Sequence, residues 1–496
     1  MRQVEVVQGI IGSTIRQYKR PVMIMLQGFA LALPLGGCWL TGNLPEPGLD
    51  IPAAYRLGSS NAKTAQAALP KLDWWRAFHS RELTSVVERA RDANLDIAAA
   101  VARVVQADAQ ARVAGAALLP IIDFSGNATH SRSSQSTSSG SSSSGSERDS
   151  LLGTLNASYE IDFWGKNRYA LQAAEETAVA SRFDKEVVAL STVATAANAY
   201  FQVLASQDRL RVASENLKSA NRVLDLIKQR LNAGTASELE VAQQESVVNG
   251  IRASIPTLRQ TLAQNRNALA VLMARSPERV NIRGGSLNNI SVPRVTPGLP
   301  SELLAQRPDI REAEAKLAAA HANVIVARAQ FLPSIKLTGQ GGYQSAVLQT
   351  LLRPESALYS VAAGVTQPIF EAGTLTGNLD LQEGKQDELL QTYRKAVISG
   401  FSDVETALES VRQTALRERL QRDVVASSRR AFDISEQRFE QGTIDLVTVL
   451  QTQQTLYSAQ DTLVQARLAH LQAIVSLYQA LGGGWLPKPV EPRHAR

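Results

Sequence analysis

The pattern of apolar and polar positions changes its period twice along the chain, at Pro120 and at Pro333. Before each proline, alanine and larger apolar residues recur at spacings of three and four, which is typical of a helix that packs along a coiled-coil seam. After each proline, apolar and polar residues alternate, which predicts a β-strand with one apolar face. The first of these helices is predicted over about 83–117. The seam of the second consists of Ala313, Leu317, Ala320, Val324 and Ala327.

The two transitions belong to an internal duplication. Landmark residues of segment 96–120 recur 213 positions later in segment 309–333. A second pair of landmarks, Gly234-Thr235 and Gly442-Thr443, lies 208 positions apart. Chance similarity between alanine-rich helices is the alternative explanation, and the paired Leu-Pro and Gly-Thr dipeptides argue against it. The sequence therefore predicts one structural unit written twice.

Each alternating segment is about ten residues long, the length needed to cross a bilayer at a tilt. The first begins at Ile122 and is followed by a predicted return strand over 151–161, and the second begins at Ile335 and returns over 357–369. A soluble strand pair would alternate in the same way, but the length and the pairing favour membrane-spanning strands. Residues 131–146, which are mostly serine and glycine, predict a flexible loop outside the cell.

Four strands are too few to close a barrel. An open sheet edge in lipid leaves backbone donors and acceptors without partners, at a cost of several kcal/mol each. The chain is therefore expected to form an oligomer. A trimer would supply twelve strands and an aqueous lumen, and a tetramer would also close the barrel.

A long helix without proline is predicted over 167–232, and at 1.5 Å per residue it would extend roughly 100 Å. Its counterpart is 375–441. Both are expected to reverse at the Gly-Thr dipeptides, where glycine ends one helix and threonine caps the next. The returning helix of the second copy carries His470 on its apolar seam, and we expect a packed histidine there and no metal ligand.

The amino-terminal residues have the pattern of a secreted lipoprotein. Arg16, Lys19 and Arg20 precede the apolar stretch 21–35, which is too short for a membrane-spanning helix but fits a signal peptide. The stretch ends in Leu-Gly-Gly followed by Cys38, which resembles the bacterial lipoprotein processing box. Trp39 is not the aspartate that retains such lipoproteins in the inner membrane, so the resemblance implies an outer-membrane lipid anchor at Cys38. The alternative is an ordinary buried cysteine.

These landmarks predict six segments. They are a lipoprotein signal peptide (1–37), a lipidated amino-terminal arm (38–80), a first repeat (81–275), an irregular connector (276–300), a second repeat (301–481) and a carboxy-terminal tail (482–496). Each repeat is expected to contain a helix, a strand pair and a long helical hairpin.

Composition excludes several classes of protein. The formal charge is +6, but Lys and Arg alternate with Asp and Glu at helical spacing, as on solvated faces, which argues against nucleic-acid binding. One cysteine and five scattered histidines provide no disulfide framework and no recognisable metal or cofactor site. Zincin and phosphate-loop motifs are absent from the sequence, so we do not expect an enzyme. Only 5% aromatic residues over 496 positions favour elongated helices over compact cores.

The combined motifs resemble those of the TolC-like outer-membrane factors, and in particular the lipoprotein branch that serves resistance-nodulation-division (RND) efflux pumps. The resemblance covers nearly the whole mature chain. It is carried by 35–38, 159–165, 306–310, 367–370 and the two Gly-Thr turns. The implied fold is mainly helical with a membrane β-barrel: an internally duplicated trimeric tube in which a twelve-stranded barrel continues into a periplasmic helical barrel.

The resemblance also implies partners and an entrance. The partners would be two further copies of the chain, a periplasmic adaptor protein, an inner-membrane RND transporter and outer-membrane lipid. The tip turns at Gly234, Thr235, Gly442 and Thr443 would meet the adaptor.

In relatives the second tip carries an apolar and an acidic residue that constrict the entrance. The corresponding positions here are Val447 and Gln451, so the acid is missing. Glu240 at the first tip is either a gating residue or a first-turn carboxylate stabilised by the helix dipole.

The implied function is a passive exit duct that conducts small molecules from the periplasm to the outside. Two alternatives remain, namely the outer-membrane channel of type I protein secretion and a periplasmic coiled-coil protein that forms no channel. Met273 is the only methionine after Cys38, which argues against a methionine-lined path for copper or silver. Cargo selection is expected to reside in the pump.

Overall fold

The computed structural model describes residues 71–132, 147–295 and 300–485, together with 45, 47–49, 51–52 and 55–56. The described chain divides into two compact units. The first is built from Asp108–Thr177 and Lys316–Leu390, and the second from Gly48–Ala107, Ala178–Ala315 and Gln391–Arg496. Cys38, the signal peptide, most of the arm, residues 133–146 and the tail beyond 485 lie outside the described residues.

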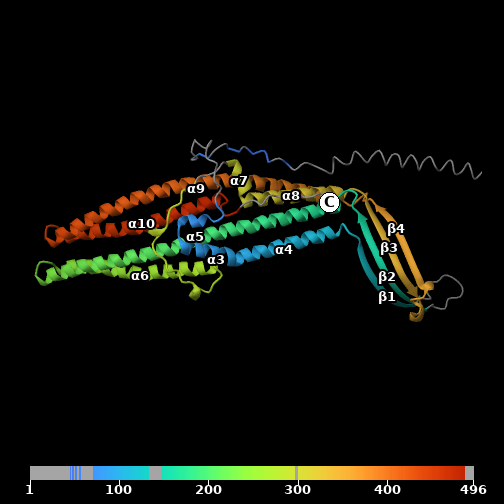
Figure 1. Ribbon diagram of the computed structural model, residues 1–496, viewed down its shortest axis with the longest axis horizontal. Coiled ribbons are helices and arrows are strands. Elements are labelled where there is room, and N and C mark those ends of the chain that lie inside the picture. The colour runs from blue at the N-terminus through green and yellow to red at the C-terminus, as the bar shows by residue number, and fades with distance from the viewer. Residues whose placement is uncertain are drawn as a thin grey trace, which may run out of the picture. The chain divides into compact units, whose positions relative to one another are not determined.

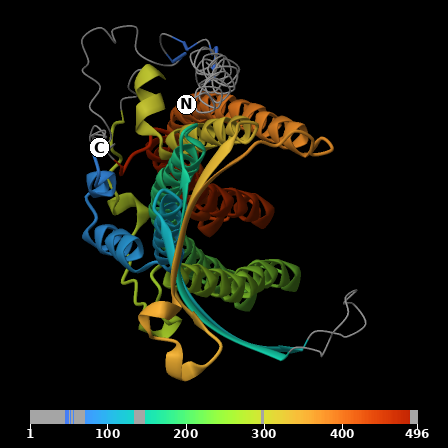
Figure 2. The same cartoon turned by 90° about the vertical axis from the view of Figure 1, so that its right-hand side faces the viewer.

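The first unit contains a four-stranded antiparallel sheet with the strand order β1-β2-β3-β4 (Figure 1). The strands are β1 (Ile121–Arg132), β2 (Glu147–Ile161), β3 (Ser334–Ser345) and β4 (Ala357–Thr366). The sheet is curved, and Figure 2 shows it as an arc. The return strand predicted to reach residue 369 ends at Thr366, because Pro368 has no backbone N–H to donate to a ladder.

Two 67-residue helices dominate the chain, as the sequence predicted. They are α5 (Lys166–Asn232) and α9 (Thr374–Glu440), and each reverses into a 35-residue partner, α6 (Glu238–Leu272) or α10 (Leu446–Ala480). Among the described helices, α5 is the one with an apolar stretch long enough to cross a bilayer. Of that stretch, 56% is buried inside the protein, as in a core helix.

The first predicted helix is broken into α3 (Arg81–Ala93) and α4 (Leu95–Ala116). The break lies at Asn94, which is 4% exposed. Its side-chain oxygen accepts hydrogen bonds from the N–H groups of Asp96 and Ile97 at 2.8 and 3.2 Å, and its amide donates to the carbonyl of Leu272 at 3.1 Å. Prediction of one continuous helix was therefore wrong, because asparagine competes for the backbone and caps a new helix.

The second repeat has a similar helix pair with a different environment. It consists of α7 (Pro300–Gln306) and α8 (Pro308–Ala329). All five predicted seam residues of α8 are buried. On α4, by contrast, large apolar side chains are exposed within this chain; they are Leu95, Val101, Val105 and Val113. The duplicated helices α4 and α8 therefore differ in how far their apolar side chains are buried.

The main core of the second unit lies where α3, α5 and α10 meet the connector. The short 3₁₀ helix η1 (Trp74–Phe78) docks there, since Trp74 and Trp75 are almost fully buried. The ring of Trp74 stacks on Tyr478 of α10 with centroids 4.8 Å apart. This end of the arm is therefore docked on the core of the second unit. The connector is irregular, as predicted, and contains two short 3₁₀ turns, η3 (Pro277–Arg279) and η4 (Leu287–Asn289).

Candidate functional site: a two-faced sheet and two hairpin tips

The register of the sheet separates apolar from polar side chains. Adjacent residues of a strand point to opposite faces, so rows of paired residues lie on one face. One row is apolar and consists of Phe124, Leu155, Gly341 and Tyr359. The next row is polar and consists of Asp123, Asn156, Gln340 and Ser360. The sheet thus has one face suited to lipid and one suited to water, as in a membrane barrel.

Side chains on the polar face bond to one another across the strands. The amide of Asn156 donates to the carboxylate of Asp123 at 2.9 Å, and the hydroxyls of Ser125 and Thr154 lie 2.9 Å apart. Among the described residues the apolar face has no packing partner, and Phe124 and Tyr359 are 71% and 87% exposed. The missing partner of that face is an apolar solvent or another chain.

Both edges of the sheet are open. Among the described strands, β1 pairs only with β2 and β4 pairs only with β3. An unpaired edge leaves a row of backbone N–H and C=O groups without partners, which lipid cannot satisfy. The sheet is therefore an incomplete barrel that needs strands from other chains.

A junction motif connects β2 to α5. Asp162 begins the helix by accepting hydrogen bonds from the N–H groups of Asn167 and Arg168 at 3.0 and 2.8 Å. Gly165 adopts φ +82°, which glycine tolerates and other residues rarely adopt. The indole of Trp164 donates to the carbonyl of Pro333 at 2.8 Å, so the first repeat is tied to the start of β3. This segment therefore fixes where strands become helices.

The segment 306–310 holds a second junction, between α7, α8 and the end of α10. The guanidinium of Arg307 donates to Asp309 at 2.6 and 3.0 Å, to Asp403 of α9 at 2.9 Å and to the carbonyl of Ala480 at 3.3 Å. Burial lowers the pKa of Arg307, but the bonds and charges of the two aspartates outweigh it and raise the pKa. The cation is thus permanently held at this junction.

The two hairpin tips share one turn geometry. Gly234 and Gly442 have φ of +71° and +73°, in the left-handed region. The N–H groups of Thr235 and Thr443 donate back five residues to Arg230 and Arg438 at 2.8 and 2.9 Å, which is the Schellman pattern of a helix end. The predicted tip turns are therefore present at both positions.

The predicted capping role of the two tip threonines is wrong. The Thr235 and Thr443 hydroxyls donate to the preceding helix, to the carbonyls of Arg230 and Arg438. Helix α6 is capped instead by Ser237, whose hydroxyl accepts from the N–H of Glu240 at 3.3 Å. In both turns the residue that caps the returning helix comes two positions after the threonine, at Ser237 and at Asp445.

The second tip is capped by an aspartate. Asp445 accepts the N–H of Thr448 at 3.0 Å and its hydroxyl at 2.6 Å. The side-chain hydrogen bond from Thr448, followed by the backbone bond, lowers the pKa of Asp445. The acidic group at this tip therefore stays ionised and starts α10.

The candidate entrance residues occupy the first two turns of α6 and α10. Glu240 completes a capping box, because its carboxylate accepts the N–H of Ser237 at 2.7 Å. This contact gives Glu240 a local helix-starting role, in line with the first-turn interpretation. Val447 and Gln451 are exposed one turn apart on α10, and Val447 is 48% exposed. Both are therefore free to face another chain.

Contacts between the two hairpins could not be read from the sequence. Near the tips, Arg230 of α5 donates to the carbonyl of Phe439 of α9 at 2.9 Å, and its guanidinium lies 4.6 Å from the centre of the Phe439 ring. Farther from the tips, Arg209 and Asp461 form a bidentate pair at 2.6 and 3.2 Å. These contacts join the hairpins of one chain side by side.

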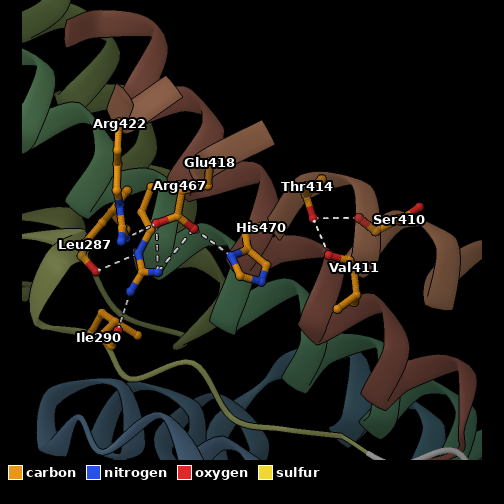
Figure 3. Close-up of polar contacts among 9 residues, drawn as sticks. All are labelled: Leu287, Ile290, Ser410, Val411, Thr414, Glu418, Arg422, Arg467 and His470. Atoms are coloured by element: carbon orange, nitrogen blue, oxygen red, sulfur yellow. Dashed lines mark hydrogen bonds and ion pairs between the residues drawn. The ribbon is translucent and has the colours of Figure 1, made fainter. Parts of the chain in front are cut away.

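A buried charge cluster joins α9, α10 and the connector (Figure 3). Glu418 is 3% exposed and accepts from Arg467 at 3.1 and 3.3 Å, from His470 at 2.6 Å and from Arg422. Arg467 also donates to the carbonyls of Leu287 and Ile290, at 3.4 and 2.7 Å. The cluster therefore attaches the connector to α10.

The ionisation of Glu418 depends on these neighbouring side chains. Burial alone raises the pKa of Glu418, but the hydrogen bond from His470 and the charges of Arg467 and Arg422 outweigh burial and lower the pKa to about 2. His470 is thus a packed, carboxylate-bonded histidine, as predicted. Among the described residues, no group of three or more His, Cys, Asp or Glu could hold a metal ion.

The other side of the connector is held by α5. The carboxylate of Asp208, which is 2% exposed, accepts the N–H of Leu287 at 2.9 Å and the hydroxyl of Ser286 at 3.0 Å. The same carboxylate accepts a hydrogen bond from the guanidinium of Arg211 at 2.9 Å, and this bond is the largest cause of the raised pKa of Arg211. The connector turn at 286–290 is therefore fixed between two helices of opposite repeats.

Comparison with known proteins identifies the family of this architecture. The chain matches the model described as outer membrane efflux protein over residues 86–275 and 299–483, that is, over both repeats. The chain belongs to the outer membrane efflux protein family.

Relatives match this efflux protein over nearly their whole length. It is 40% identical over 459 residues to the pyoverdine export outer membrane protein OpmQ of Pseudomonas putida, covering 91% of this chain and 97% of the relative. It is 41% identical to OpmQ of Pseudomonas aeruginosa, with 91% and 95% covered. The CmeC outer membrane channel of Campylobacter jejuni superposes with a TM-score of 0.83 at 26% identity, over 90% of this chain and 95% of that structure.

These matches confirm several predictions for this efflux protein. The predicted membership of the TolC-like outer-membrane factors is confirmed, as is the fold class of a duplicated, mainly helical chain with a membrane β-barrel. The protein is an outer-membrane exit duct of an efflux system and extends into the periplasm. The members of this family are channels, not enzymes.

Proposed function

We propose that three copies of this chain form the outer-membrane duct of a tripartite efflux system, in which a periplasmic adaptor and an inner-membrane RND transporter deliver small molecules to it. The open-edged, two-faced sheet carries this proposal, because four strands per chain become twelve in a trimer and can enclose an aqueous lumen. The exposed apolar residues of α4 offer a second copy a surface to cover. In this role the duct is passive and catalyses no reaction.

The stoichiometry and the pore are tested together. Light scattering of the purified protein, corrected for detergent, should give a mass of three chains, and planar bilayers should show a water-filled pore. A mass of four chains would replace the trimer by a tetramer. A single chain that passes no ions would contradict the duct and would favour a periplasmic coiled-coil protein.

Cargo is inferred from the relatives. Two proteins named for pyoverdine export are 40% and 41% identical to this chain, and we infer that a pyoverdine-like secreted compound is exported through it. A strain lacking its own pyoverdine duct should recover secretion when this chain is expressed with its cognate pump and adaptor. Export of a protein with no recovery of the small molecule would instead support type I secretion.

The amino-terminal anchor is a separate proposal. We propose that Cys38 is lipidated after removal of residues 1–37, and that the arm (38–80), two repeats (81–275 and 301–481), connector (276–300) and tail (482–496) form the mature chain. Mass spectrometry of the mature amino terminus should show an acylated Cys38. Cys38→Ser should abolish the acylation while pore conductance in bilayers remains, because the strands are unchanged.

The entrance is proposed to lie at the tips, where three copies of Val447 would form an apolar constriction that resists wetting. Exposure of Val447 and Gln451 on one face of α10 supports this. Val447→Ala combined with Gln451→Ala should raise single-channel conductance, because both side chains narrow the opening. Leu239→Ala is a matched control, since Leu239 is an exposed apolar residue at the other tip. Unchanged conductance in the double variant would reject this entrance.

A further inference from the structure

The two strand-pair loops differ in kind, although the strands they join are duplicates. The first contains mostly serine and glycine over 131–146. The second, between β3 and β4, contains the sequence Ala-Val-Leu-Gln-Thr-Leu-Leu-Arg-Pro-Glu-Ser over 346–356. Its large apolar side chains are exposed: Val347 by 53%, Leu348 by 72% and Leu352 by 79%. An exposed apolar loop outside the cell requires a partner that removes it from water.

The loop is folded by its own hydrogen bonds. It forms two 3₁₀ turns, η5 (Leu348–Thr350) and η6 (Pro354–Ser356). The backbone N–H groups that donate to the carbonyl three residues earlier are those of Thr350, Leu351, Arg353 and Ser356. The hydroxyl of Thr350 lies 2.5 Å from that of Ser345, and the Ser356 hydroxyl donates to the carbonyl of Thr350 at 2.8 Å. Polar groups are thus paired inside the loop while apolar groups point away from it.

The position of the loop indicates its partner. In Figure 2 the loop, drawn in amber, lies on the convex side of the arc of strands. When such a sheet closes into a barrel, the convex face is the outer face, and in a membrane barrel the outer face contacts lipid. The loop is therefore continuous with the lipid-facing surface formed by residues such as Tyr359.

We propose that the loop 346–356 inserts Val347, Leu348 and Leu352 into the outer leaflet of the outer membrane and is a second, lipid-directed anchor of each chain. Lipid requires backbone polar groups to be satisfied internally, and the four backbone hydrogen bonds of the loop satisfy four N–H groups and four carbonyls. Arg353 and Glu355 follow Leu352 and are exposed without a partner among the described residues. Two charged groups at this point limit insertion to the boundary between acyl chains and headgroups.

The proposal is tested with single-cysteine labels on the full-length oligomer in lipid vesicles. An environment-sensitive fluorophore at Leu348→Cys and at Leu352→Cys should emit as in an apolar medium and lose most of its emission when the vesicle lipid carries brominated acyl chains. Thr129→Cys is the matched control, since Thr129 lies near the same end of the sheet on the polar face. Parent protein treated with the same fluorophore gives the background signal from Cys38, which is present in every variant.

Three results would overturn the proposal. Emission at Leu348 and Leu352 that is water-like and quenched by aqueous iodide would place the loop in solvent. Energy transfer between labels on two protomers, without quenching by brominated lipid, would assign the loop to another copy of the chain. Quenching equal to that at Thr129 would show no preference for lipid. The proposal rests on the outer-membrane location, and pore conductance measured in the same vesicles distinguishes a failed anchor from a failed duct.

Discussion

At the scale of single residues, the most constrained group is the carboxylate of Glu418. It is buried with two arginines and a histidine around it, and one of these arginines, Arg467, also donates to the connector carbonyls. A buried charge pair adds little net stability over an apolar substitute, but loss of one partner leaves an unpaired buried charge. The sequence marked His470 as a packed histidine, but Glu418 lies 52 residues away and was not recognised as its partner.

The first prediction concerns this carboxylate. Glu418→Gln should destabilise the second unit by about 3 kcal/mol, because Arg467 is left buried without its counter-ion. The expected result is a lower thermal midpoint of the purified protein. Glu409→Gln on the same helix is the control, since the Glu409 side chain is 47% exposed and should change the midpoint little.

The same carboxylate predicts a dependence on pH. The pKa of Glu418 is about 2 in the folded protein, whereas the ordinary value is 4.5. Ionised Glu418 therefore contributes its full stabilisation of the fold above pH 4.5, and this contribution is lost as the pH falls toward 2. Thermal midpoints of the parent protein should decrease over this window, and those of Glu418→Gln should decrease less. Parallel curves for the two proteins would show that other carboxylates account for the acid sensitivity.

A second single-residue prediction concerns the contact between the tips. Arg230→Leu removes the hydrogen bond to the Phe439 carbonyl and the contact with its ring, each worth about 1–2 kcal/mol. Hydrogen exchange at the ends of α5 and α9 should accelerate. Arg222→Leu, about two turns earlier on α5, should change exchange there less, because Arg222 is exposed and its side chain donates to Ser219 of its own helix. Equal protection in both variants would contradict this role of Arg230.

At the scale of elements, helix ends decide where the chain reverses, and they follow from short local signals. Glycine with positive φ ends α5 and α9, and a serine or aspartate three residues farther on starts the returning helix. The sequence predicted the turn positions because glycine acts locally. It did not identify the caps, since Thr235, Ser237, Thr443 and Asp445 are all residue types that can cap a helix.

The correction at the tips leads to a prediction. Ser237→Ala should destabilise the first turn of α6 by about 1 kcal/mol, because it removes the acceptor for the Glu240 N–H. Hydrogen exchange of the first α6 amides should accelerate by roughly fivefold, the equivalent of that energy. Thr235→Ala should leave those amides protected, since Thr235 bonds only to the preceding helix. Faster exchange in Thr235→Ala together with unchanged exchange in Ser237→Ala would instead identify the threonine as the cap.

At the scale of the whole molecule, the incomplete sheet determines assembly. Its edges and its apolar face are unpaired in the part of the chain that the structure describes, and both requirements are met when copies share a barrel in lipid. The α4 helix adds an apolar surface of the same kind. The outward-facing side chains are therefore as important to this protein as its cores.

A paired substitution tests the two faces. Val361 lies on the apolar face of β4 and Ser360, its neighbour, on the polar face. Val361→Arg should cost about 2–4 kcal/mol near the bilayer centre and reduce the yield of heat-resistant oligomer in outer membranes. Ser360→Arg should assemble normally, since its side chain faces the lumen, and should change ion selectivity. Equal loss in both variants would mean that neither face contacts lipid.

The sequence by itself determined the duplication, the lengths of the long helices, the strand pairs with two faces and the glycine turns. These features depend on backbone periodicity and on residues that act within a few positions, so local reasoning reaches them. It missed the break at Asn94, because the pattern on both sides is helical and the contact of the Asn94 amide with the Leu272 carbonyl lies 178 positions away in the sequence.

The tertiary structure decided which copies of a repeated pattern are buried and which charges meet. The α8 seam is buried while the α4 stripe is exposed, although the two helices are related by duplication. Glu418 meets Arg467 and His470, and Arg467 meets the connector about 180 positions away. Such contacts depend on the way in which the long helices pack against one another. That packing is selected by the burial of apolar surface and by the pairing of buried charges, and both involve residues that are far apart in the sequence.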